Sequence, residues 1–127
     1  MLNYARHRAM EALRKTSTAV LVTNGPAGVQ AGIFAYEAVE LSLYLLVPQT
    51  SDHLFNLEHD PRVIMLSAGW QLKGEARVVC RDALEIELRL LQVPEAGWCA
   101  LVRAEPRQVQ IGRQTGWGNV ETIDISG

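Results

Sequence analysis

The sequence predicts a mainly β domain, a small antiparallel barrel with two or three short helices. Six or seven short segments are apolar or β-branched and have the length of strands. Turn-forming residues such as glycine, asparagine and proline separate these segments, as they do in small all-β folds. The 127 residues suit one domain, residues 1–127, with enough chain to bury a hydrophobic core.

Apolar and β-branched residues mark the expected strands. The segment Thr18–Thr23 (TAVLVT) is the clearest of them. The others are Val29–Tyr36, Leu41–Val47, Arg62–Ala68, Gln71–Cys80, Trp98–Ala104 and Arg107–Ile111, followed by a short β-like stretch, Thr122–Ile125. The two segments on either side of Pro106 are either two strands or one strand with a kink. Glu37–Glu40 is expected to form the turn after the second strand.

Three segments have the pattern of helices. The first runs from Asn3 to Lys15 and the second from Asp52 to His59. The third, Asp82–Gln92, has the strongest signals. Its first residue is a good N-cap, Glu85 follows three residues later as in a capping box, and three leucines line one face.

Charge and hydropathy argue against some classes of protein. The net charge is −2 and the basic residues are scattered, which argues against nucleic acid as a partner. No apolar run approaches the ~18 residues of a membrane span. The first ten residues also lack the apolar core of a signal peptide, so we expect a cytoplasmic protein with no membrane partner. Cys80 and Cys99 are expected to be reduced thiols packed as small apolar groups.

Motifs of the common catalytic sites are missing. The sequence has no G-x-G-x-x-G after a strand, no Walker loop and no G-x-S-x-G elbow. His53 and His59 are six residues apart, so they would face different sides of a helix, which disfavours a shared metal ion. The residues alone therefore predict no metal site and name no reaction or catalytic group.

A loop with two hydroxyl groups lies between the strand that ends at Val47 and the second helix. Pro48 stops the strand, and Ser51 is a good N-cap. A helix N-terminus offers unpaired N–H groups and a partial positive charge. Thr50, Ser51 and His53 at this position form either a cradle for a phosphate or only a helix cap followed by a solvated histidine.

Gly32 lies in the middle of the second expected strand. Alternation puts Gln30, Gly32 and Phe34 on one side of this strand, with Ala31 and Ile33 on the other. Glycine weakens a strand, so either another group approaches the backbone closely here or the strand bends.

The segment around the second helix also carries a resemblance to a known family. It reads Ser51-Asp52-His53, Asn56-Leu57 and Asp60-Pro61-Arg62-Val63, between two strands. This pattern resembles the pyridoxamine 5′-phosphate oxidase-related family, the FMN-binding split barrels. The similarity extends from about Thr16 to Ile111 and includes TAVLVT, VQAGIFAY, GEARVV and RAEPRQVQI. It implies a six-stranded antiparallel Greek-key split barrel, and a homodimer with FMN at the subunit interface.

The resemblance also implies where FMN would lie. The phosphate would lie beside Thr50, Ser51 and His53. The ring would lie along the second strand and the end of the third. The residues implied around the ring are Ala31, Gly32, Ile33 and Val47, with Gln30 as the nearest polar residue, Gln71 from the fifth strand and Trp117 from the partner subunit. His53 replaces the lysine of the oxidase, as in a branch that includes haem-utilisation proteins. An imidazole is the weaker phosphate anchor because it is only partly charged near neutral pH.

By this resemblance the chain is an FMN-binding protein, and a flavin-dependent oxidoreductase of unknown substrate. The chain is too short to contain the oxidase's pyridoxal-recognition segment, so oxidation of pyridoxamine phosphate is not expected. Two alternatives stay open. One is a non-catalytic flavin or haem-binding module, with His7, His53 or His59 as a haem ligand. The other is a dimeric barrel that has lost its ligand.

Overall fold

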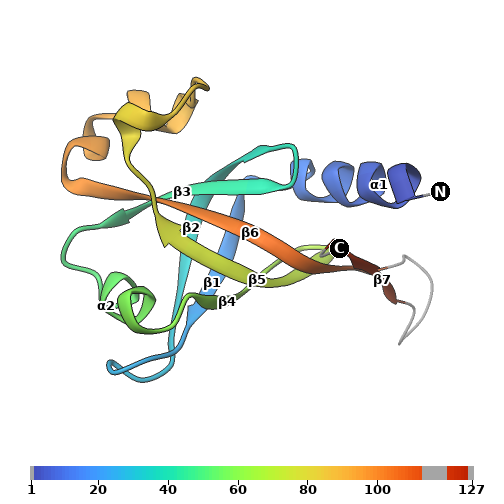
Figure 1. Ribbon diagram of the computed structural model, residues 1–127, viewed down its shortest axis with the longest axis horizontal. Helices are drawn as coiled ribbons and strands as arrows, with labels where there is room; N and C mark the ends of the chain where they lie inside the picture. The colour runs from blue at the N-terminus through green and yellow to red at the C-terminus, as the bar shows by residue number, and fades with distance from the viewer. Residues whose placement is uncertain (1, 113–119, 126–127) are drawn as a thin grey trace.

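The computed structural model describes residues 2–112 and 120–125. Within these residues, seven strands and two α-helices are joined by short loops and by three 3₁₀ helices. In chain order the elements are α1 (Leu2–Arg14), β1 (Thr18–Thr23), β2 (Gln30–Val39), β3 (Ser42–Pro48), α2 (Asp52–His59), β4 (Arg62–Ser67), β5 (Trp70–Val78), η1 (Arg81–Ala83), η2 (Arg89–Gln92), η3 (Pro94–Trp98), β6 (Cys99–Gly112) and β7 (Val120–Asp124). Figure 1 shows α1 and α2 on opposite sides of the strands.

The strands form a closed barrel. Among the described residues their order is β3-β2-β1-β4-β5-β6-β7, and every neighbouring pair is antiparallel. A further pairing between β3 and β6 closes the first six strands, and β7 lies outside on β6. The run β4-β1-β2-β3 has the spatial order of a Greek key. The predicted fold class, a six-stranded antiparallel barrel with short helices, is confirmed.

β6 is one continuous strand, so the segments on either side of Pro106 are not separate. Its pairing with β5 shifts register between Lys73 and Gly74. A Cβ on Gly74 would lie 2.1 Å from the backbone oxygen of Glu105. Glycine is therefore required for the two strands to approach this closely, and the irregularity lets both strands continue around the barrel.

The predicted helix at Asp82–Gln92 is wrong. All of its residues are described, and they form only η1 and η2, with an irregular stretch between them. The leucines of this segment pack on β3 and β6 in a small hydrophobic cluster. Its buried members are Tyr44, Leu88 and Leu101, and Leu84, Leu90 and Leu91 pack against them. This tertiary packing overrides the local helix propensity and the capping-box signal.

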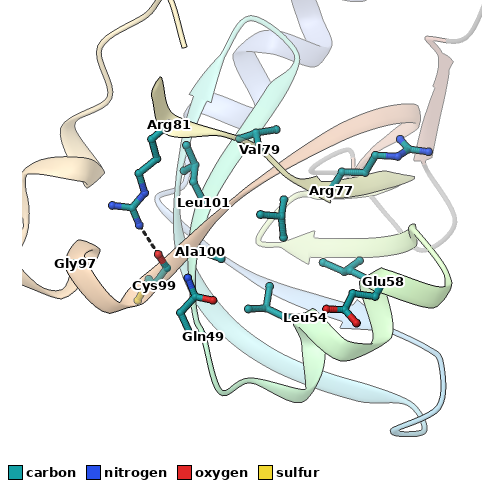
Figure 2. A pocket seen from close by; sticks show the side chains of 12 residues that line it. Gln49, Leu54, Glu58, Arg77, Val79, Arg81, Gly97, Cys99, Ala100 and Leu101 are labelled. Atoms are coloured by element: carbon teal, nitrogen blue, oxygen red, sulfur yellow. Dashed lines mark hydrogen bonds between the residues drawn. The ribbon is translucent and has the colours of Figure 1, made fainter. Parts of the chain in front are cut away.

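Several hydrogen bonds hold the segment from residue 79 to residue 98 against the barrel, and two of them lie near its start and its end. The guanidinium of Arg81 donates to the carbonyl oxygen of Cys99, as Figure 2 shows. The backbone N–H of Gln49, just after β3, donates to the carbonyl oxygen of Trp98 over 3.2 Å. These contacts fix the start and the end of the segment beside the loop that leads into α2.

The turn predicted at Glu37–Glu40 is also wrong, because β2 continues to Val39 and pairs there with Ser42. The chain reverses over Glu40 and Leu41 instead. Glu40 has a φ of 54°, in the left-handed region that tight turns between strands use. The connection takes two residues, so Glu37, Ala38 and Val39 belong to the strand.

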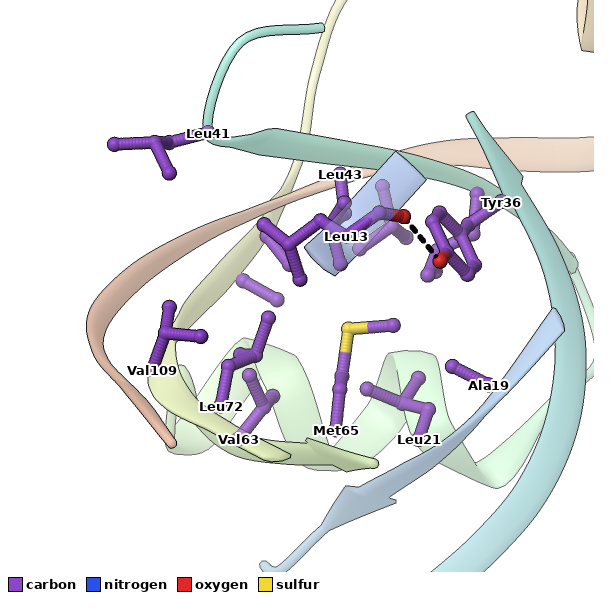
Figure 3. Packing of buried hydrophobic residues seen from close by; sticks show 14 of the residues in the cluster. Leu13, Ala19, Leu21, Tyr36, Leu41, Leu43, Val63, Met65, Leu72 and Val109 are labelled. Carbon is purple, nitrogen blue, oxygen red and sulfur yellow. Dashed lines mark hydrogen bonds between the residues drawn. The ribbon is translucent and has the colours of Figure 1, made fainter. Parts of the chain in front are cut away.

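Large aliphatic side chains fill the barrel interior (Figure 3). Leu21, Met65 and Leu72 are fully buried there. α1 adds Leu13, whose carbonyl oxygen accepts a hydrogen bond of 2.5 Å from the hydroxyl of Tyr36. Burying each such aliphatic side chain contributes about 1.5–3 kcal/mol, so this core supplies most of the free energy that holds the barrel together.

Candidate functional site

The barrel is split between β2 and β3. These strands pair only from Tyr36–Val39 to Ser42–Leu45. In the part of the chain that the structure describes, residues 30–35 of β2 pair with β1 but not with β3, while the end of β3 pairs with β6. One edge of β2 therefore carries backbone N–H and C=O groups without a strand partner. The residues predicted to contact a flavin ring, Ala31, Gly32 and Ile33, lie on this open edge.

α2 begins as the sequence predicts. Ser51 is its N-cap, with extended backbone, and its hydroxyl oxygen accepts a hydrogen bond of 3.1 Å from the N–H of His53. The Ser51 hydroxyl keeps its own proton, which is free to be donated to a ligand. Thr50, one residue earlier, is exposed. At the other end of the helix, the N–H of Asp60 donates to Asn56 and the next residue is a proline.

His53 points into the barrel. Its side chain is only 6 % exposed, so the interpretation of it as a solvated surface residue is wrong. Its Nδ1 lies 2.8 Å from the Thr23 hydroxyl oxygen, which also accepts a hydrogen bond of 3.2 Å from the Asn56 amide. Because the Thr23 oxygen accepts from Asn56, its own proton is available to Nδ1 of His53, and with the imidazole in the tautomer that carries its proton on Nε2, Thr23 donates to His53.

Burial lowers the pKa of His53 below its ordinary value of 6.5, and the negative charge of Asp52 opposes this shift only in part. The imidazole is therefore neutral at neutral pH. This agrees with the hydrogen bond that it accepts from Thr23. His53 supplies an N–H donor inside the split, and it does not supply the positive charge of a lysine at this position.

Gly32 faces this imidazole. A Cβ on Gly32 would lie 3.2 Å from Nε2 of His53 and 3.2 Å from a ring carbon of Phe34. The pairing of Gly32 with Leu21 follows the regular register of β1 and β2. Of the two explanations that the sequence left open, the close approach is therefore the one observed. The rings of Phe34 and His53 also pack in a T-shaped arrangement, with centroids 5.4 Å apart.

Asn56 is the polar residue that sequence reasoning missed, although it belongs to the motif that carried the resemblance. Its side chain is fully buried. Its amide oxygen accepts from the N–H of Ala27 over 2.9 Å, and its amide nitrogen donates to the oxygen of Gly28 over 2.8 Å. These bonds tie α2 to the β1–β2 turn. They therefore fix the helix N-terminus relative to the open edge of β2.

The remaining predicted site residues lie in three environments. Ala31 and Ile33 are exposed on the outer face of β2, and Gln71 lies on the outer face of β5. Val47 is fully buried in the core. The side chain of Gln30 donates to the carbonyl oxygen of Ala27 within the β1–β2 turn. Trp117 lies outside the described residues.

The outer face of the barrel is apolar near the split. Register places Ile33, Val20, Leu66 and Gln71 in one row across β2, β1, β4 and β5. Ile33 is 74 % exposed and Leu66 is 39 % exposed, so this row presents two large apolar side chains to solvent. The polar side of the row begins only at Gln71.

The three histidines do not meet. His59 is exposed and its Nδ1 lies 3.0 Å from the oxygen of Phe55, while Nε2 of His7 lies 2.9 Å from a carboxylate oxygen of Glu11 on α1. Within residues 2–112 and 120–125, no three histidine, cysteine or acidic side chains gather where they could hold a metal ion. No helix of this described part is both long enough and apolar enough to cross a membrane.

No protein-family model matches the sequence, and no curated protein matches it. Solved structures do match the fold. A protein from Clostridium acetobutylicum related to general stress protein 26, of the pyridoxinephosphate oxidase family, has a TM-score of 0.69 at 11 % identity and covers 98 % of this chain and 96 % of its own. An FAD-binding protein from Mesorhizobium loti has a TM-score of 0.60 at 12 % identity, over 81 % of this chain and 90 % of its own.

A haem-binding protein from Mycobacterium smegmatis has a TM-score of 0.71 at 19 % identity. The match covers 94 % of this chain but only 57 % of the mycobacterial protein, so this chain spans little more than half of its length. These similarities are to the fold. They confirm that the chain has the split-barrel fold that the resemblance implied, a fold found in proteins that bind flavin or haem.

Proposed function

We propose that this protein binds FMN, with the ring along the open edge of β2 and the phosphate at the N-terminus of α2. The observation that carries the proposal is the missing β2–β3 pairing at residues 30–35 of the described chain. The pyrimidine part of a flavin offers hydrogen-bond donors and acceptors along one edge, as a strand does. Such a ring satisfies backbone groups that no neighbouring strand reaches.

Three features of the site fit this ligand. Gly32 has no Cβ, so Nε2 of His53 lies close to the backbone of β2 at the open edge, where the ring would lie. Thr50 and Ser51 offer two hydroxyl donors, and the first turn of α2 offers N–H groups with a partial positive charge. His53 connects the proposed phosphate position with the proposed ring position, because it follows Ser51 closely in the chain and its Nε2 lies beside Gly32.

One feature fits less well. The neutral, buried His53 brings no cation to the phosphate, and Asp52 adds a negative charge in the first turn of α2. The phosphate is then held by hydroxyl and backbone N–H groups, whose hydrogen bonds are weaker than those from a lysine or arginine. We therefore expect looser binding of FMN than a lysine at position 53 would give.

The proposed activity is that of a flavin-dependent oxidoreductase whose substrate is not specified. Bound FMN would supply the transfer of hydride or single electrons. The chain itself supplies binding and orientation: Ile33 and the β2 backbone hold the ring, Ser51 holds the phosphate, and Nε2 of His53 offers a neutral donor beside Gly32. Gln71 and Trp117 belong to the proposed ring environment from the fifth strand and from the partner subunit, and Val47 backs the end of β3.

We also propose that the protein is a homodimer, and that a second copy covers the outer face of β1, β2 and β4. Ile33 and Leu66 are the exposed apolar residues that support this arrangement. A surface of this kind costs free energy in water and is typical of subunit interfaces. The cytoplasmic location expected from the sequence stays a prediction.

The first experiment is an absorbance spectrum of the protein as purified, followed by titration with FMN. Flavin absorption bands, or one FMN bound per protomer after titration, would support the proposal. A Soret band in place of flavin bands would support the haem-binding alternative. A colourless protein that leaves FMN fluorescence unchanged would contradict flavin binding and favour a barrel without a ligand.

A further inference from the structure

A cavity of about 600 Å³ lies on the other side of α2 from the split, between α2, the end of β5 and the start of β6. Its volume is in the range of small-molecule sites. The floor is apolar, and its buried members are Leu54, Leu57, Cys99, Ala100 and Leu101. The polar side chains of Gln49, Glu58, Arg77 and Arg81 lie around it, as Figure 2 shows. None of the residues assigned to the flavin lines this cavity.

Arg81 is the unusual residue of this rim. Three arginines of the described chain are half-buried, namely Arg8, Arg81 and Arg103. Arg8 is paired with Glu121, and Arg103 with Glu105. No carboxylate among the described residues forms an ion pair with Arg81, whose recorded contact is the hydrogen bond to the oxygen of Cys99. A partly buried charge without a counter-charge is costly, so an anion is the missing partner.

The remaining N–H donors of Arg81 are available to an anionic group at one end of the cavity. Its guanidinium has five N–H donors, and the bond to Cys99 uses one of them. The same bond holds the side chain in place, so less conformational freedom is lost when a ligand binds. Figure 2 shows the Gln49 amide on the same side of the cavity as Arg81, beyond Cys99. A planar carboxylate matches a guanidinium fork of this kind.

The opposite side of the rim limits the charge of the ligand. Glu58 of α2 lies there with Arg77 of β5, as Figure 2 shows. Arg77 is exposed and shares Glu75, at 3.3 Å, with Arg107. Glu58 therefore repels a second negative charge on the ligand, and a single carboxylate at the Arg81 end is the favoured arrangement. The apolar floor between the two ends takes a hydrocarbon body.

We propose that this cavity binds a monocarboxylate with an apolar body, such as a medium-chain fatty acid, through Arg81. This site is independent of the flavin proposal, because it uses other residues and a different side of α2. If the protein did not bind FMN, the proposal of a carboxylate site in this cavity would still hold.

The test is calorimetric titration of the full chain with octanoate, octanol and octylamine. The three probes have the same hydrocarbon chain and differ in the head group. We expect saturable one-to-one binding of octanoate, octanol at least about tenfold weaker, and no binding of octylamine, since a charge-assisted hydrogen bond changes affinity by about tenfold or more. Equal binding of octanoate and octanol, or no binding of octanoate, would overturn the proposal.

Matched variants locate the site. Arg81→Gln should weaken octanoate at least about tenfold and leave octanol unchanged, whereas Arg89→Gln, an exposed arginine of η2 outside the cavity, should change neither. Glu58→Gln should strengthen octanoate binding. Equal effects of Arg81→Gln and Arg89→Gln would overturn the assignment.

A steric variant guards against misfolding of Arg81→Gln. Gly97 lines the cavity, and a Cβ there would meet no atom within 4 Å, so we expect Gly97→Leu to fold and to reduce the free space of the cavity. It should abolish octanoate binding with Arg81 in place. Unchanged octanoate affinity in Gly97→Leu would count against the cavity as the site.

Discussion

Nδ1 of His53 lies 2.8 Å from the hydroxyl oxygen of Thr23, and this buried pair joins the first turn of α2 to the end of β1. Asn56, one turn further along the helix, adds a second bond to the same hydroxyl. Because these polar atoms are shielded from water, their mutual hydrogen bonds are needed to keep them buried. The pair thereby fixes the N-terminus of α2 beside the open edge of β2.

Replacing Thr23 by valine removes the shared hydroxyl without changing the shape of the side chain. Nδ1 of His53 and the Asn56 amide each lose a partner, so we expect the free energy of unfolding to fall by about 1–3 kcal/mol. Urea denaturation measures this change. Thr18→Val, at the exposed start of the same strand, is the control and should stay within about 0.5 kcal/mol of the wild type. Equal losses in both variants would show that the buried hydroxyl has no special role.

The stability of the protein should depend on the protonation of His53. Its folded-state pKa is below 6.5, mainly through burial, so the unfolded chain takes up a proton at a higher pH than the folded chain does. The contribution of the neutral imidazole is complete above pH 6.5 and is lost as the pH falls from 6.5 through the lowered folded pKa. Asp60, whose pKa Arg62 lowers to about 2, titrates below this window.

Urea denaturation at a series of pH values between about 7 and 5 measures this dependence. In His53→Leu the free energy of unfolding should depend less on pH, and it should be lower overall than in the wild type. His7→Gln, which alters an exposed histidine, should keep the wild-type dependence. The explanation would fail if wild type and His53→Leu lost stability equally over this range.

The outer face of the barrel predicts the oligomeric state. Ile33 is 74 % exposed in the apolar row that we propose a second copy covers, so Ile33→Glu should convert a dimer into a monomer. Light scattering at micromolar protein concentration measures the mass. Ile86→Glu replaces an exposed isoleucine of the segment after β5 and should leave the dimer intact. A monomeric wild-type protein would contradict the proposed interface.

Ser51→Asp separates the capping role of Ser51 from its proposed phosphate contact. Aspartate caps a helix as well as serine does, so the thermal stability should change little. Its carboxylate, however, cannot donate a proton and repels the phosphate, so FMN affinity should fall at least about tenfold. Flavin fluorescence measures the affinity and circular dichroism measures the stability. Ser67→Asp, on a hydroxyl that bonds to Thr18 far from α2, is the control. Unchanged affinity in Ser51→Asp would reject the phosphate position.

Local signals predicted the barrel and the second helix well. Thr18–Thr23 is strand β1 with the expected bounds, because a β-branched apolar run needs no distant information to be recognised. Asp52–His59 is α2 with the expected cap at Ser51. In the segment Asp82–Gln92, by contrast, the leucine spacing matched a helix only by coincidence. Those leucines pack on strands that are distant in sequence, and no local pattern reveals such packing.

The candidate site was predicted only in part for the same reason. The sequence left open whether a group approaches Gly32 or the strand bends there, and it did not identify His53 as the group that approaches it. A histidine just after a helix cap, next to Asp52, has the appearance of a surface residue. Its partner Thr23 lies 30 positions earlier in the chain. Both side chains point inward only because the strands close into a barrel. The assignment of Val47 to the ring environment stays a prediction, and the structure locates that side chain in the core.

The central claim is that the open edge of β2 and the N-terminus of α2 together bind a flavin through its ring and its phosphate. Parallel fluorescence titrations of the wild-type protein with FMN and with riboflavin, which lacks the phosphate, test it most directly. The account predicts saturable binding of both, with FMN at least about tenfold tighter because of the phosphate contacts. Equal affinity for both would contradict the proposed binding of the phosphate at α2. No binding of either would contradict the flavin site altogether.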